Sequence, residues 1–142
     1  MKKILFTFVM MLSALSASAF EFDGIDLNGT VTTISREISK RGYVYDNEKN
    51  ALVGLAHGTE ILLTLNYEDV TEKGHLGQLH VDVPSNSASF FNNAVMLLNV
   101  LYHQVLNTEE YVYDVDGQGT TLTVFKTDKG IRLTYQTPYY KK

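Results

Sequence analysis

The chain has 142 residues, a formal net charge of −4 and no cysteine or tryptophan. Its basic residues are scattered, which argues against a nucleic-acid partner, because phosphate binding needs Lys and Arg gathered on one surface. Without cysteine the fold can have no disulfide, so apolar packing has to hold it together.

The first nineteen residues have the three parts of a secretory signal peptide. Lys2-Lys3 supplies the positive start, residues 4–15 form an apolar run, and Ala17-Ser18-Ala19 provides small residues before a cleavage point. The run is about a dozen residues, whereas a bilayer-spanning helix needs roughly 20. We therefore expect cleavage after Ala19, no transmembrane segment afterwards, and a periplasmic or secreted α+β domain over residues 20–142.

The first half of that domain is predicted to be one helix followed by four strands. Thr30 can cap a helix in which Val31, Ile34 and Ile38 recur every three or four residues, until Gly42 ends it. The pattern then alternates between apolar and polar residues, which is typical of strands. The predicted strands are Tyr43–Asp46, Ala51–Ala56, Glu60–Glu68 and His75–Val83.

The second half is predicted to be a more apolar helix followed by three strands. Residues 90–106 are apolar over more than one stripe, as expected of a helix that covers a sheet or one that also meets a second surface. We favour the first of these two explanations. Turns rich in Gly and Asp then separate three strands, Glu109–Val115, Thr121–Lys126 and Ile131–Thr137.

A weak internal repeat links the two halves. Tyr-Val-Tyr-Asp at 43–46 recurs at 111–114, and Leu52 and Ile61 then match Leu122 and Ile131. The shared order favours a duplicated αβββ unit, but chance is an equal explanation because strands draw on few residue types. We predict an α+β fold with two helices packed on one face of an antiparallel sheet of six or seven strands, and with the other face open.

The sequence holds no recognisable catalytic set. It lacks a cysteine nucleophile, a serine in a nucleophile elbow and a glycine-rich phosphate loop, so we predict neither an enzyme nor a cofactor. His80 and Asp82 share one strand face and His75 is nearby, which makes them an alternative metal site. Metal sites usually need three or four ligands, however, and an exposed polar sheet face explains the pattern without a metal.

Tyrosines are the remaining candidates for binding. The chain has nine, and tyrosine offers interfaces a large contact area with little entropy to lose. Tyrosine is also an ordinary strand residue, which is the simpler explanation. If a binding face exists, we expect it on the open sheet surface where strand tyrosines gather, and the candidates are Tyr43, Tyr45, Tyr111, Tyr113 and Tyr135.

Residues 22–30, Phe-Asp-Gly-Ile-Asp-Leu-Asn-Gly-Thr, lead into a helix that ends at Gly42-Tyr43, and strands, a second helix and a meander follow. This order resembles small exported proteins of uncharacterised function from Gram-negative gut anaerobes. Their layout is similar to that of beta-lactamase inhibitor protein, in which tandem αβ units present a sheet to a partner enzyme. No residue can be carried over, because only the layout is shared.

The export signal, the missing catalytic set and the strand tyrosines together predict a non-catalytic binding or interaction module of the cell envelope. Its partner would be an envelope or extracellular protein. Two alternatives remain. One is a small-ligand carrier with a pocket between helix 90–106 and the sheet, and the other is a metal-dependent protein that uses His75, His80 and Asp82.

Overall fold

The computed structural model describes residues 21–22, 25–56, 59–67, 74–85, 87–105, 111–115, 117 and 119–140. The predicted signal peptide, residues 1–19, is outside these described residues, and so are the ends of some predicted elements, such as Glu68, Leu106 and Glu109.

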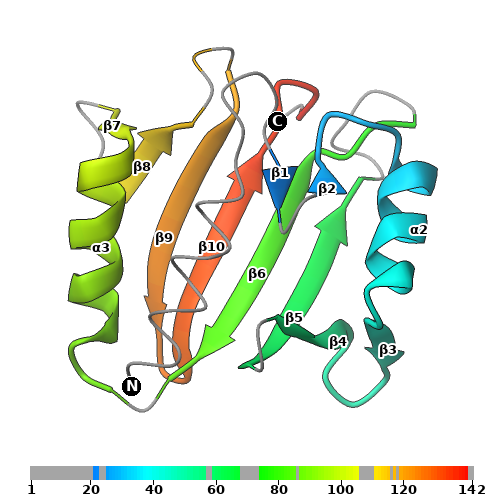
Figure 1. The fold of residues 1–142 in the computed structure, drawn as a ribbon, viewed down its shortest axis with the longest axis horizontal. Helices are drawn as coiled ribbons and strands as arrows, with labels where there is room; N and C mark the ends of the chain where they lie inside the picture. The colour runs from blue at the N-terminus through cyan, green and yellow to red at the C-terminus, as the bar shows by residue number, and fades with distance from the viewer. Residues whose placement is uncertain are drawn as a thin grey trace.

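An antiparallel sheet of eight strands dominates the described part of the chain (Figure 1). The strands lie in the spatial order β3, β4, β5, β6, β10, β9, β8, β7. Their bounds are β3 Val44–Asp46, β4 Ala51–Ala56, β5 Thr59–Asn66, β6 Gln78–Pro84, β7 His103–Gln104, β8 Tyr111–Asp114, β9 Thr121–Thr127 and β10 Gly130–Gln136. A separate pair is formed by β1 (Glu21–Phe22) and β2 (Ile25–Asp26). The α+β class and the antiparallel sheet are therefore as predicted.

The sheet has eight strands rather than the predicted six or seven. The additional strand is β7, which lies inside the segment predicted as helix. That helix, α3 (Phe90–Leu101), ends earlier, because Tyr102 has extended backbone angles of φ −137° and ψ 163°. His103 and Gln104 then pair with Asp114 and Tyr113 of β8, which gives backbone groups of β8 hydrogen-bond partners.

The other described helix, α2 (Val31–Lys40), begins and ends where the sequence predicts. The Thr30 hydroxyl accepts a hydrogen bond from the Thr33 backbone N–H at 3.2 Å, and Gly42 has a φ of +88°. Such a cap satisfies one of the free N–H groups of the first turn. In Figure 1, α2 and α3 stand at opposite ends of the sheet's width, with β6 and β10 between them.

One face of the sheet packs into the core with both helices. Leu63, Val81, Leu133 and Val124 lie directly opposite one another across β5, β6, β10 and β9. All four are buried, and they belong to the same apolar cluster as helix residues such as Ile38 and Leu98. Because strand side chains alternate, the residues between them point to the other side, which we call the outer face.

Candidate functional site on the outer face of the sheet

Three of the five candidate tyrosines lie in the core and not on the outer face, which corrects our expectation. Tyr43, Tyr113 and Tyr135 are at most 3% exposed. Tyr113 lies opposite Leu122, and Tyr135 lies opposite both Leu122 and Leu79, so these rings share the covered face. Burial raises the pKa of Tyr113 and of Tyr135, which keeps both hydroxyls protonated.

The other two candidates, Tyr45 and Tyr111, are exposed but lie far apart in the sheet, on β3 and β8. Tyr45 donates a hydrogen bond to Asn50 Oδ1 at 2.6 Å. The Tyr111 ring meets Phe91 of α3 edge-on, with ring centroids 5.6 Å apart. The five tyrosines therefore form no single patch on the open side of the sheet.

The described contacts between α3 and the sheet are packing contacts. Besides the Phe91–Tyr111 contact, Tyr113 donates to Asn99 Oδ1 at 2.8 Å, and Ala94 and Leu98 are fully buried. These contacts favour a packed interface over the ligand pocket considered for this helix.

The three residues of the alternative metal site do not come together as ligands. His75 stacks on Tyr139 with ring centroids 3.9 Å apart. His80 and Asp82 do share the outer face, but both carboxylate oxygens of Asp82 accept hydrogen bonds from Arg132. Within the described residues, no three His, Cys, Asp or Glu side chains are grouped so that they could hold a metal ion.

On the outer face, Arg132 forms an ion pair with Asp82 through two hydrogen bonds. Arg132 Nε lies 2.8 Å from Asp82 Oδ1, and Nη2 lies 3.1 Å from Oδ2. This bidentate geometry fixes both side chains. The hydrogen bond to Asp82 also raises the pKa of Arg132. The two residues are directly opposite in the β6–β10 register, with Leu62 and Phe125 on either side of them.

Neighbouring rows of the outer face are also linked across the strands. Asn66 Nδ2 donates to Gln78 Oε1 at 3.1 Å, and Gln78 Nε2 donates to Gln136 Oε1 at 3.0 Å. In the row between, His80 Nδ1 and Thr134 Oγ1 share a hydrogen bond of 2.8 Å. Side chains that hold one another in place form a preorganised surface, which loses little conformational entropy when a partner binds.

An open cavity of about 770 Å³ lies at the end of the outer face near Pro84. Its lining includes the Asp82–Arg132 pair and a second ion pair, Lys49 to Glu60, with Nζ and Oε1 2.9 Å apart. Leu62 also lines it, as an apolar side chain between the pairs. We call the five residues Lys49, Glu60, Leu62, Asp82 and Arg132 the ion-pair groove. Its volume falls in the range typical of binding sites, roughly 300–1,000 Å³.

Sequence reasoning missed most of this groove. It placed Asp82 on an outward strand face, but it named neither Arg132 nor Lys49 and Glu60. The alternation of β10 does indicate that Arg132 points outward, because its neighbours Ile131 and Leu133 are apolar. No local sequence pattern predicts the register that places Arg132 beside Asp82, which is fifty positions away in the chain.

The pKa of His80 reports on the charges of the outer face. Burial and the nearby Arg132 cation lower its pKa below the usual 6.5, and Asp82 acts in the opposite direction. Because the unfolded chain then binds more protons than the folded chain below pH 6.5, we expect the free energy of unfolding to fall as pH drops from about 6.5 through the folded-state pKa.

Arg132→Gln should raise the pKa of His80, since it removes the cation and leaves Asp82. NMR titration of the His80 ring protons measures this, with Lys126→Gln as the control, because Lys126 lies on the opposite side of the sheet. A wild-type midpoint at or above 6.5, or an equal shift in both variants, would contradict the electrostatic explanation.

The described residues thus form an α+β structure with an antiparallel sheet and a charged groove on its outer face. They contain no helix long and apolar enough to cross a bilayer. The chain matches no protein-family model, and neither the curated proteins nor the solved structures include a match to it. The function therefore has to be argued from the groove itself.

Proposed function

We propose that the protein is a non-catalytic binding module of the cell envelope, and that the ion-pair groove binds a protein partner. The observation that carries this proposal is the cavity of about 770 Å³, in which four of the charged lining side chains form two ion pairs on a hydrogen-bonded sheet face. The signal-peptide pattern of residues 1–19 supports export.

The arrangement of charges favours a protein partner over a simple ion. Glu60, Asp82 and Arg132 come from the neighbouring strands β5, β6 and β10, and Lys49 pairs with Glu60, so the signs run plus, minus, minus, plus. Each of these four charges already has a partner of opposite sign, so an isolated anion or cation would gain little from them. A protein surface can match both signs and also cover Leu62, and such complementarity gives specificity.

A site-specific crosslinking experiment tests this function. A photo-reactive amino acid at position 62 should give a discrete adduct with one envelope protein in the native host. The same residue at position 126, which is exposed on the other side of the sheet, serves as the control. Equal adducts at both positions would contradict a groove-specific partner.

The charge order can be tested without removing the ion pair. The double exchange Asp82→Arg with Arg132→Asp keeps one cation and one anion in contact but reverses their positions. We expect this variant to fold with an unchanged circular dichroism spectrum and to lose the position-62 adduct. If the adduct persists at the wild-type yield, the charge pattern does not select the partner.

We also propose that the chain is a duplicated unit with the tandem layout seen in beta-lactamase inhibitor protein. The strand order supports this, because α2 precedes β3 to β6, α3 precedes β7 to β10, and the two sets meet at β6 and β10. Tyr45 lies opposite Leu52 just as Tyr113 lies opposite Leu122. The hairpins that follow are less alike, because the β4–β5 register and the β9–β10 register differ by two residues.

A further inference from the structure

The ion-pair groove continues toward the edge of the sheet along a row of apolar side chains. Val53 of β4 lies directly opposite Val44 of β3 and Leu62 of β5, so the three share the outer face. Leu62 in turn lies opposite Asp82 of the Asp82–Arg132 pair. β3 is an edge strand, and Val44 is 68% exposed. We call Val44, Val53 and Leu62 the apolar row.

A second open cavity, of about 590 Å³, adjoins the apolar row. Val44 and Val53 belong to its lining, whereas Leu62 belongs to the lining of the cavity of about 770 Å³. Glu48, which lies in the turn between β3 and β4, lines both cavities. The two cavities therefore meet at Glu48, and a partner segment that fills the ion-pair groove can extend over the apolar row.

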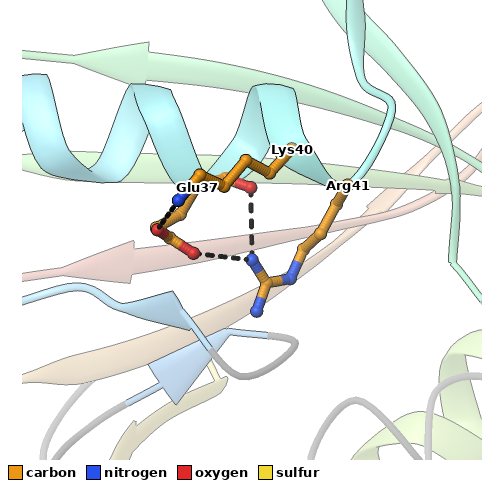
Figure 2. A network of polar contacts seen from close by, with 3 residues as sticks. All are labelled: Glu37, Lys40 and Arg41. Carbon is orange, nitrogen blue, oxygen red and sulfur yellow. Dashed lines mark hydrogen bonds and ion pairs between the residues drawn. The ribbon is translucent and has the colours of Figure 1, made fainter.

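The side chain of Glu48 is exposed and makes no ion pair with the residues that the structure describes. Its backbone N–H donates a hydrogen bond to Asp46 Oδ1 at 2.9 Å. Glu37 shows the opposite case, because both of its carboxylate oxygens contact cations at the end of α2 (Figure 2). Oε1 lies 3.3 Å from Lys40 Nζ, and Oε2 lies 3.2 Å from Arg41 Nη1. The charge of Glu48 is thus available to a cation of a partner.

The lining of the two cavities is acidic on balance. It contains five carboxylates and three cations, which are Asp46, Glu48, Glu60, Asp82 and Asp128 against Lys49, Lys129 and Arg132. An acidic surface repels anionic lipids, and it also repels a second copy of this chain, whose net charge is −4. Charge complementarity therefore favours a protein partner that carries cations.

We infer that the partner of the ion-pair groove binds through a segment that combines large apolar side chains with Lys or Arg. The apolar side chains cover the apolar row, and a Lys or Arg pairs with Glu48. Burial of the exposed part of the row supplies affinity, whereas the ion pair orients the segment. This chemistry rests on the proposed function, because it describes the partner proposed there.

NMR titration of the isotope-labelled protein with capped hexapeptides tests this chemistry. A peptide of alternating lysine and leucine should shift the backbone amide signals of Val44, Val53 and Leu62. Glutamate in place of lysine, or serine in place of leucine, should weaken binding about tenfold or more, because the first change removes the charge attraction and the second removes the apolar contact.

Two pairs of variants locate the contacts. Val44→Thr should weaken binding of the lysine–leucine peptide about fivefold, whereas Val100→Thr, at a valine of α3 that is 82% exposed, should leave it unchanged. Glu48→Gln should weaken binding about threefold at low salt, because an exposed ion pair contributes little. Glu37→Gln removes the same charge from α2 and should leave binding unchanged.

Equal affinities for the lysine and glutamate peptides would overturn the inference, and so would equal effects of the two valine variants. A dimer in sedimentation velocity that Val44→Thr disrupts would instead assign the apolar row to a second copy of the chain.

A photo-reactive amino acid at position 44 separates this inference from the proposed function. In the native host it should give an adduct with the same protein as position 62. An adduct from position 62 alone would retain the proposed function and reject the extended surface. A bound lysine–leucine peptide without an adduct from either position would contradict the proposed function and leave the chemistry of the surface supported.

Discussion

Gly130→Ala should lower the free energy of unfolding by about 3 kcal/mol or more, as backbone strain adds to steric overlap. Gly130 begins β10 with a φ of +153°, a conformation that residues with a side chain rarely adopt. An added Cβ would also overlap the carbonyl oxygen of Val83 and come within 2.7 Å of the Ser85 nitrogen. Both neighbours are backbone atoms, so relief requires the end of β6 to move away from β10.

Gly117→Ala is the matched control, measured by the same urea denaturation. Gly117 also has a positive φ, +69°, but an added Cβ would meet no atom within 4 Å. Only the conformational cost should remain, about 1 kcal/mol. If the two variants lost equal stability, the contact between the turn and β6 would not be the cause.

The sequence predicts the elements of this fold that have a local signal. Thr30 and Gly42 delimit α2 through cap chemistry, and strand-like patterns bounded by polar turns indicate the other seven strands of the main sheet. β7 could not be predicted, because two residues are too few to show a period. The apolar pattern also runs past Leu101 to Val105, so it extends the helix too far.

The tyrosines show a second limit of sequence reasoning. Alternation indicates which residues share a face, but an aromatic ring suits a core as well as an interface, so it does not say which face is covered. Tyr43 is an example of a ring that packs in the core. A Cβ at Gly54 of β4 would come within 2.5 Å of the Tyr43 ring. The ring of Tyr43 therefore packs over β4 in space that only glycine leaves free, and this fit depends on three-dimensional proximity.

The ion-pair groove shows the same limit for charged side chains. The outward position of Asp82 follows from its own strand, whereas its pairing with Arg132 follows from the β6–β10 register. That register joins the last strand of each half of the chain. It is set by apolar side chains on the opposite face, since a slip of one residue would expose them. The stability of the groove is thus coupled to the core beneath it.

Leu133→Ala tests this coupling. Leu133 is fully buried between Val81 of β6 and Val124 of β9, and it directly follows Arg132 in the chain. We expect a loss of about 3 kcal/mol in the free energy of unfolding, from lost apolar burial and the cavity left behind. Leu55→Ala, at an exposed position of β4, should change it by less than about 0.5 kcal/mol.

Urea denaturation of both variants measures the energies, and the position-62 crosslink of each reports on the groove. Because a rigid sheet holds the Asp82–Arg132 pair, Leu133→Ala should also reduce the adduct yield under conditions where the variant is still folded. Equal losses of stability in the two leucine variants would mean that the helix-covered face is not the core. An unchanged adduct yield in Leu133→Ala would mean that the ion-pair groove keeps its geometry without the packing beneath it.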